Sequence, residues 1–322
     1  MDISYQSLQN LAQQLPPFGS DNQIISDWLQ RPEVQTYLNY YQINFCHEIA
    51  GLRHRFGQLS AGEFTIACHH WQPQQSKGTL FVVHGYTDNV GSMQHLIRFL
   101  LQQQWAVIAF DLPGHGLSSG EQASIDSFDQ YRQVLFDVLN QLQDKTPAPW
   151  HILGQSTGGA VILNYLASYP DQQKIDRALL LAPLIRSYRW QRDRCLFELI
   201  KPFISSLQRT FTISSHDQSF LDFVQHRDPL QPLRTPVAWI AAMRDWVGKF
   251  TELTPQWRQL TVIQGDDDHT VDWQFNIAEI ERVFPKADTH IISGAHHQLV
   301  NEAPAYRAQV FALIDKWLQS EK

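Results

Sequence analysis

The sequence has few cysteines and no long uninterrupted hydrophobic segment. Its three cysteines, Cys46, Cys68 and Cys195, are too few and too far apart for a disulfide framework, and they suit a reducing compartment. No stretch approaches the roughly 18 consecutive apolar residues that predict a transmembrane helix. The first residues lack the basic and apolar regions of a secretory signal peptide. We therefore expect a cytoplasmic protein.

Basic residues are not in excess either. The formal net charge is −7 at pH 7, so we expect no nucleic-acid partner, because such proteins usually carry a strong positive field. Hydrophobic residues make up 43% of the chain and aromatic residues 12%. A chain of 322 residues with this composition can bury the core of one large α/β domain and a subdomain.

Strand-like and helix-like segments alternate along most of the chain. The predicted strands are 52–58, 64–71, 79–84, 106–110, 150–155, 178–183, 260–265 and 288–292. The predicted helices between and after them are 92–103, 127–143, 157–169, 273–284 and 304–319. The central strands are continuous apolar runs, which indicates that both faces are covered. The pattern predicts a mostly parallel eight-stranded sheet flanked by helices.

Two parts of the chain fall outside this alternation. Residues 1–48 have helical periodicity, with Asp21 as a candidate N-cap, and we expect an N-terminal helical extension there. Residues 186–256 are too many for an ordinary connection, and their apolar residues recur with helical spacing. The predicted α/β core then comprises residues 49–185 and 257–322.

The segment Gly154–Gly159 reads G-x-S-x-G between an apolar strand, 150–153, and a helical stretch, 160–169. This strand–turn–helix context is what a nucleophile elbow requires, and an ordinary strand-to-helix turn is the alternative. In an elbow, Ser156 would lie exposed at the end of the strand, and the N–H of Thr157 would point at the reacting carbonyl.

Further candidate residues follow in the chain order Ser, Asp, His. A predicted strand, 260–263, leads into a loop with four aspartates, Gly265–Asp272. A second strand, 289–292, leads into Ser293–Leu299, which contains two histidines. Strand ends followed by loops are where catalytic groups lie in open α/β sheets.

An earlier strand, 80–83, ends in His84–Gly85. Such a turn can present the N–H of Tyr86, which together with the N–H of Thr157 would form an oxyanion hole with two donors. An ordinary strand-to-loop turn is the alternative.

The chain resembles the α/β-hydrolase superfamily, and within it the monoglyceride lipase, lysophospholipase and serine aminopeptidase group. The resemblance spans about residues 50–320 and rests on Phe81–Tyr86, Phe110–Gly120, Gly154–Gly159, Asp228–Leu230, Gly265–Asp272 and Gly294–His297. The chain departs from the usual pattern at Pro113, Gln155 and Thr157, where members of the group carry Arg, His and Met.

The resemblance implies a catalytic triad of Ser156, Asp268 and His297. It places Asp268 three residues after the strand-ending Gly265, and it favours His297 over the adjacent His296. The neighbouring carboxylates Asp266, Asp267 and Asp272 are the rivals of Asp268. The run of aspartates lacks calcium-loop spacing, so we expect no metal and no cofactor.

The resemblance also implies that residues 186–256 form a helical cap over the active site; a packed accessory bundle is the alternative. The apolar cap residues expected to contact substrate are Phe197, Ile200, Phe203 and Ile204. The cap has ten Lys or Arg against seven Asp or Glu. Arg186 and Arg189 at its start could hold an anionic head group or approach a membrane surface, or they could belong to a solvated helix face.

These features predict a serine hydrolase that cleaves small-molecule carboxylic esters through an acyl-enzyme, of the lysophospholipase or monoacylglycerol lipase type. The alternatives are a prolyl-type serine aminopeptidase, a short-chain esterase and a non-catalytic ligand-binding member of the fold. Peripheral contact with the inner face of the membrane is compatible with the lipid hypothesis. The sequence leaves the oligomeric state open.

Overall fold

The structure is a computed structural model that describes residues 3–143, 145–170, 174–192 and 203–320. The strands are β1 (Arg53–Ala61), β2 (Phe64–Gln72), β3 (Thr79–Val83), β4 (Ala106–Phe110), β5 (Trp150–Gln155), β6 (Arg177–Leu181), β7 (Ser206–Gln208), β8 (Arg234–Pro236), β9 (Thr261–Gly265) and β10 (Asp288–Ile292). The α-helices are α1 (Tyr5–Gln13), α2 (Asn22–Leu29), α3 (Pro32–Tyr40), α4 (Gln94–Gln102), α5 (Phe128–Leu142), α6 (Thr157–Ser168), α8 (Gln218–Asp222), α9 (Val237–Thr251), α10 (Trp273–Val283) and α11 (Pro304–Gln319). Short helical turns cover η1 (Phe45–His47), η2 (Val90–Met93), η3 (Phe223–Arg227) and η4 (Leu299–Asn301).

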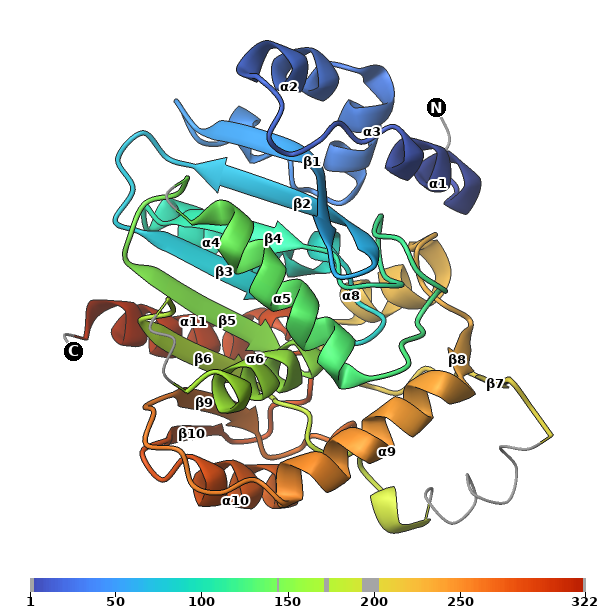
Figure 1. Ribbon diagram of the computed structural model, residues 1–322, viewed down its shortest axis with the longest axis vertical. Helices are drawn as coiled ribbons and strands as arrows, with labels where there is room; N and C mark the ends of the chain where they lie inside the picture. Colours follow the sequence, from blue (N-terminus) through green and yellow to red (C-terminus); the bar gives the residue numbers. More distant parts are fainter. Residues whose placement is uncertain (1–2, 144, 171–173, 193–202, 321–322) are drawn as a thin grey trace.

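Eight strands form one sheet in the order β1-β2-β4-β3-β5-β6-β9-β10. The strands from β4 to β10 are parallel, whereas β2 runs antiparallel to both β1 and β4. Figure 1 shows the N-terminal helices at the β1 end of this sheet and α10 and α11 toward the other end. The predicted eight-stranded, mostly parallel sheet flanked by helices is confirmed.

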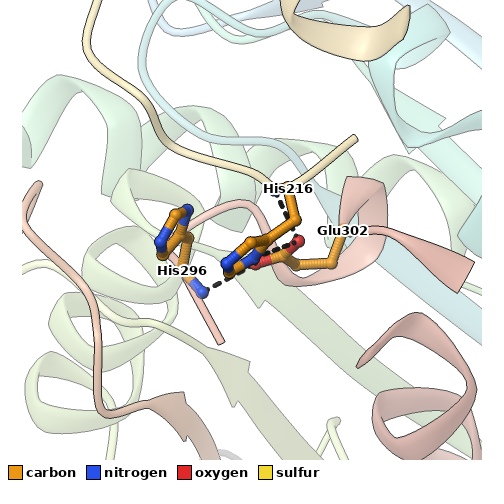
Figure 2. Close-up of side chains that lie close together, drawn as sticks. All are labelled: His216, His296 and Glu302. Atoms are coloured by element: carbon orange, nitrogen blue, oxygen red, sulfur yellow. Dashed lines mark hydrogen bonds and ion pairs between the residues drawn. The ribbon is translucent and has the colours of Figure 1, made fainter. Parts of the chain in front are cut away.

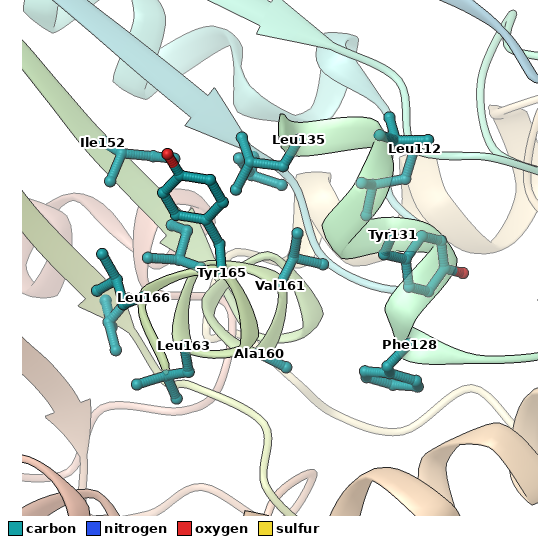
Figure 3. Packing of buried hydrophobic residues seen from close by; sticks show 14 of the residues in the cluster. Leu112, Phe128, Tyr131, Leu135, Ile152, Ala160, Val161, Leu163, Tyr165 and Leu166 are labelled. Carbon is teal, nitrogen blue, oxygen red and sulfur yellow. The ribbon is translucent and has the colours of Figure 1, made fainter. Parts of the chain in front are cut away.

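Helices cover both faces of the sheet. Successive side chains of a strand point to opposite faces, so each strand contributes to two clusters. In β3, Phe81 and Val83 join a cluster with α5, α6, α9 and α10, whereas Leu80 and Val82 join a cluster with α3, α4 and α11. Figure 3 shows part of the first cluster, with Tyr165 and Leu166 of α6 beside the sheet. This double covering explains why the central strands are continuous apolar runs.

The N-terminal helices pack on the sheet edge at β1. The carboxylate of Asp21 accepts a hydrogen bond from Ile24 N–H at 2.9 Å and caps α2, as predicted. In α2, Trp28 is buried, whereas Ile24 is 49% exposed. Between α1 and α2, the chain pairs with β1: Phe18 N–H donates to Gln58 O, and Gln58 N–H donates to Pro16 O, both at 2.8 Å.

The described residues of the insertion 186–256 differ among themselves. In α9, Trp246 and Phe250 are buried in the cluster that contains α5, and Trp246 Nε1–H donates to Leu184 O at 3.1 Å. The short strands β7 and β8 pair with each other, outside the main sheet. The described part of the insertion therefore combines a helix packed on the core, α9, with a two-stranded sheet that lies outside the main sheet. Within the described residues, no helix has the length and apolarity needed to cross a membrane.

Candidate active site

Ser156 stands at a sharp turn between β5 and α6. Its backbone has φ 53° and ψ −113°, a left-handed region that a residue with a side chain rarely adopts. Such strain costs about 1–3 kcal/mol and persists only where the surroundings fix it. Here Ser156 N–H donates to Leu181 O at 2.8 Å, and Leu184 N–H donates to Ser156 O at 3.0 Å. The turn therefore holds the serine at the carboxyl end of the sheet.

Two glycines make this turn sterically possible. A Cβ on Gly158 would lie 2.2 Å from Val83 O, and a Cβ on Gly154 would lie 2.6 Å from the backbone of Gly158. Neither position can accommodate a side chain without moving backbone. The G-x-S-x-G pattern follows from this close approach of β3, β5 and α6.

His297 and Asp268 meet at the end of the same sheet, from the loops after β10 and β9. The Nδ1 atom of His297 lies 2.7 Å from Asp268 Oδ2, and both side chains are buried. Oδ1 of Asp268 accepts the N–H groups of Thr270 and Val271 at 2.7 and 3.0 Å. Burial raises the pKa of Asp268, but His297 and these N–H donors outweigh it and bring the pKa below its ordinary value. An ionised Asp268 accepts the Nδ1–H of His297 and leaves Nε2 as a base.

The rival carboxylates have other partners. Asp266 accepts the N–H of Gly294 at 2.6 Å, and Asp267 lies 3.2 Å from His296 Nε2. Asp272 is the N-cap of α10 and forms an ion pair with Arg186. Among the described residues, none of the three is hydrogen-bonded to the ring of His297.

Two buried glutamines support the pair and were missed by the sequence analysis. Gln155 Nε2–H donates to His297 O at 2.8 Å. Gln264 Nε2–H donates to Asp268 Oδ2 at 3.0 Å. Gln155 is the last residue of β5 and Gln264 is the second-last residue of β9, and both are fully buried. A polar residue at such a position is the signal that could have identified them, because buried polar groups need partners.

Tyr86 and Thr157, whose N–H groups are the predicted oxyanion donors, both line the same cavity as Ser156. The ring of Tyr86 stacks on Trp239 with centroids 3.7 Å apart, and its hydroxyl donates to Ala123 O at 2.8 Å. These two contacts hold the side chain of Tyr86 in place, and they do not involve its backbone N–H.

The ring of His84, beside this turn, bonds to backbone groups of two loops. Its Nε2 accepts the N–H of Leu112 at 2.9 Å, and its Nδ1 lies 2.7 Å from Gly85 O. Burial, with a smaller contribution from His115, lowers the pKa of His84 to about 3. The neutral ring ties the turn after β3 to the loop after β4.

A buried hydrogen-bond network connects the N-terminal extension to this turn. Tyr41 Oη–H donates to Asp228 Oδ1 at 2.6 Å, and Asn89 Nδ2–H donates to Asp228 Oδ2 at 3.3 Å. The amide of Gln231 donates both to Asp228 Oδ2 at 3.2 Å and to Thr87 O at 2.9 Å. Asp228 therefore links the extension, the end of the insertion and the loop that follows Tyr86.

Ser156 and His297 open into one cavity of about 880 Å³. Its apolar wall is formed by Leu184, Trp239, Ile240, Met243 and Val271. Its more polar wall includes Asp88, Arg209, Gln218, Asp222 and Gln225. A cavity of this volume can hold a drug-sized or lipid-like molecule, and its lining contains both apolar and polar side chains.

Two of the four predicted apolar cap residues lie in the described part of the chain, and neither of these two lines the cavity. Phe197 and Ile200 lie outside the described residues. Phe203 is 85% exposed, and neither Phe203 nor Ile204 is among the described residues that line the cavity. Among the described residues, the apolar lining comes from α9, Leu184 and Val271 and also from the insertion ahead of α9, through Phe211, Ile213 and Leu221.

The two predicted basic residues also lie away from the cavity lining. Arg186 pairs with Asp272 at 2.7 Å and lies 3.4 Å over the ring of Phe275. Arg189 is exposed at the surface. Arg192 and Arg209 are the described arginines that line the cavity. Arg209 is part-buried and hydrogen-bonded to a neighbouring side chain, which fixes its position.

Comparison with known proteins gives consistent results. The model of the family "serine aminopeptidase, S33" matches residues 74–304. The chain is 27% identical to the monoglyceride lipase of Homo sapiens over 269 residues, which is 79% of this chain and 86% of that protein. It is 21% identical to a probable lysophospholipase L2 of Haemophilus influenzae over 274 residues, 78% of this chain and 87% of that protein.

Solved structures give the same fold. A soluble variant of monoglyceride lipase from Saccharomyces cerevisiae has a TM-score of 0.69 at 16% identity, covering 81% of this chain and 94% of that one. The monoacylglycerol lipase of Paleococcus ferrophilus has a TM-score of 0.68 at 19% identity, covering 80% and 98%. The predicted α/β-hydrolase fold is confirmed.

Proposed function

Because the chain belongs to the serine aminopeptidase S33 family of α/β-hydrolases, we propose that it cleaves carboxylic esters through an acyl-enzyme formed on Ser156. One observation carries the proposal. A strained, cavity-facing serine shares its cavity with a buried histidine that contacts an ionised aspartate at 2.7 Å. This is the arrangement of an activated nucleophile, its base and the group that orients the base.

In the proposed reaction, His297 Nε2 takes the proton of Ser156 Oγ as the oxygen attacks the ester carbonyl. Asp268 stabilises the resulting imidazolium, and the N–H groups of Tyr86 and Thr157 stabilise the oxyanion. The C–O bond to the alcohol breaks, and His297 returns the proton to the leaving oxygen. Water activated by His297 then attacks the acyl-enzyme and releases the acid.

The apolar wall favours a lipid-like acyl group, of a lysophospholipid or a monoacylglycerol. Trp239, Ile240 and Met243 on α9 offer a continuous apolar surface close to Ser156. Each methylene buried there contributes up to about 0.8 kcal/mol. The names of two relatives, a monoglyceride lipase and a probable lysophospholipase, agree with this substrate class.

The aminopeptidase alternative needs a carboxylate to bind a free amine. Among described residues, the cavity carboxylates are those of Asp88 and Asp222. Burial raises the pKa of Asp88, and its oxygens already accept hydrogen bonds from Gln298 at 3.2 and 3.3 Å. Asp222 pairs with Arg227 at 2.9 Å. Burial disfavours the charged form of Asp88, and Asp222 already has an arginine partner. An amine would therefore gain little from either carboxylate.

A chain-length series from acetyl to palmitoyl esters of one alcohol tests the proposal. We expect kcat/KM to rise with chain length by an order of magnitude or more over a few carbons. The series should be run beside a lysophospholipid, a monoacylglycerol and an aminoacyl-nitroanilide. A maximum at acetyl would contradict the lipid class, and faster cleavage of the nitroanilide would contradict ester hydrolysis as the main activity. Failure to label with a fluorophosphonate would leave a non-catalytic protein.

A pair of tryptophan substitutions locates the acyl site. Met243→Trp should fill the apolar wall and move the optimum to shorter chains, while acetyl ester turnover stays near wild type. Leu233→Trp is the matched control, because Leu233 is 68% exposed and does not line the cavity. An equal shift in both variants would mean that the acyl chain lies elsewhere.

A further inference from the structure

Three residues far apart in the sequence come together beside the catalytic loop. His216 precedes α8, His296 follows β10, and Glu302 precedes α11. One potential ligand atom from each lies within 4.8 Å of the others, and Figure 2 shows both histidines beside the carboxylate. We propose that His216, His296 and Glu302 bind a divalent transition-metal ion of the Zn²⁺ type. Imidazole and carboxylate are ligands that such ions accept.

The pair of His216 and Glu302 has nearly the separation of two ligands on one ion. Nδ1 of His216 lies 3.0 Å from Glu302 Oε1. Zinc–ligand distances of about 2.0–2.1 Å place neighbouring atoms of a tetrahedral site roughly 3.3–3.4 Å apart. An ion can therefore take the place of the proton between these two atoms, and that proton moves to Nε2 of the neutral ring.

His296 supplies a buried ring nitrogen that lacks a partner. Its Nε2 lies 3.2 Å from Asp267 Oδ2, whereas its Nδ1 is buried and has no hydrogen-bond partner among the described residues. A buried polar atom without a partner points to an ion or water at that position. The contact between Nε2 and a carboxylate is the outer-shell arrangement that fixes the tautomer of a metal-binding histidine.

Glu302 is held as an anion in a fixed orientation. It is fully buried and accepts the N–H groups of His216, His296 and Ala303 at 2.7–3.0 Å. A buried, oriented carboxylate next to two histidines supplies the negative charge that a divalent cation needs.

The ion would enter from the side of His216. The two imidazole rings stack with centroids 3.8 Å apart and an interplanar angle of 22°, and the other face of His216 stacks on Tyr306. The side chain of His216 is 36% exposed, so an ion can reach it from solvent, and its ring would turn out of this stack when both histidines bind the ion. Water would complete the coordination.

Such an ion would join the insertion to the loop that carries the proposed base. Close to His216, Ser214 O already accepts the N–H of Gln298 at 2.8 Å, and Gln298 follows His297. Coordination by both His216 and His296 would add a second link between these segments. This binding site is independent of the ester hydrolysis proposed above, because ion binding can be measured without turnover.

Isothermal titration of the tag-free full chain with ZnCl₂ tests the site. We expect one ion per chain with a micromolar or lower Kd, and a rise in Tm on addition of the ion. His216→Ala should weaken binding by more than about tenfold and abolish the rise in Tm, because a ligand is lost. This variant should fold, since the residue is at the surface. Glu302→Gln should also weaken binding.

His290→Ala is the matched control. His290 also contacts a carboxylate, with Nε2 3.1 Å from Asp288 Oδ2, but it lies on β10 outside the cluster. Its variant should bind Zn²⁺ as tightly as wild type. Absence of stoichiometric binding in the wild type, or equal affinity in His216→Ala, would overturn the proposal. Equal weakening by His290→Ala would show that the ion binds to surface histidines in general.

Discussion

At the scale of single residues, the serine hydroxyl is the group on which the proposed chemistry depends. Ser156→Ala should lower ester turnover on the order of 10⁴-fold, because the nucleophile is lost while its neighbours remain. The backbone contacts of the turn do not involve the hydroxyl, so the Tm should change little. Turnover and thermal unfolding of the purified variant measure both effects. Retention of more than a tenth of the activity would mean that the nucleophile is another residue.

The three consecutive aspartates allow a matched comparison. Asp268→Asn should lower kcat by about 10³–10⁴-fold, because a neutral amide does not stabilise the imidazolium and its NH2 group can hold the ring in the wrong tautomer. Asp267→Asn should stay within about threefold of wild type, since Asp267 is half exposed and contacts His296 rather than His297. Steady-state kinetics on one ester decides between them. A comparable loss in both variants would argue against Asp268 as the orienting acid.

Some residues of the site could be predicted from sequence, and others could not. The elbow serine was predictable because the two glycines that its turn requires lie two residues away on either side of it in the sequence. Gln155 was not predictable, because its partner lies 142 residues away in the sequence. Gln264 was not predictable either, because its bond to Asp268, four residues on, depends on how the loop after β9 folds back. His216 was missed for the same reason, since its neighbours are at positions 296 and 302.

At the scale of elements, the N-terminal extension is coupled to the oxyanion turn. Tyr41→Phe should remove the donor to buried Asp228, which costs about 1–3 kcal/mol, and loosen the loop that Gln231 holds through Thr87 O. We expect kcat to fall several-fold with little change in KM, because the proposed role of the Tyr86 N–H is to stabilise the transition state. Kinetics and urea unfolding of the same variant separate the two effects.

Tyr40→Phe is the control for this experiment. Tyr40 Oη–H donates to Arg227 O at 2.6 Å, so it binds the same segment without contacting Asp228. Its variant should keep kcat within about twofold of wild type. If Tyr41→Phe lowers stability but leaves kcat unchanged, the network has no role in positioning the turn.

The elements of the core were predictable, and those of the insertion were less so. The strands β3 to β6 are buried on both faces, so apolar residues make up most of each strand. In the insertion, apolar residues of α9 pack on the core, whereas Phe203 faces solvent. Helical periodicity alone cannot distinguish a helix that packs on the core from a segment that extends away from it.

At the scale of the whole molecule, buried neutral histidines should make the fold sensitive to acid. Burial, as the largest cause, lowers the pKa of His54 and His84 to about 3, and of His70 and His115 to about 4. The unfolded chain takes up protons near pH 6.5. The stability these groups provide is therefore present above pH 6.5 and lost as pH falls toward 4. Asp111, whose pKa burial raises to about 6, acts in the opposite sense as a single group.

Urea unfolding at pH 7.5, 6.5 and 5.5 measures this dependence. The free energy of unfolding should fall steeply below pH 6.5, and His70→Gln should reduce the slope by about 1.4 kcal/mol per pH unit. A free energy that stays constant from pH 7.5 to 5.5 would contradict the expectation.

The pairing of Pro16 and Phe18 with β1 has a consequence for self-association. An outer strand normally presents unpaired N–H and C=O groups, which can template the addition of a strand from another molecule. At Gln58, both outward groups are already occupied by the chain itself, and a Cβ on the adjacent Gly57 would lie 2.6 Å from Pro16 O. A second copy therefore finds no vacant hydrogen-bonding edge at this point. At this point of the edge strand, the extension therefore blocks the addition of a strand from another molecule.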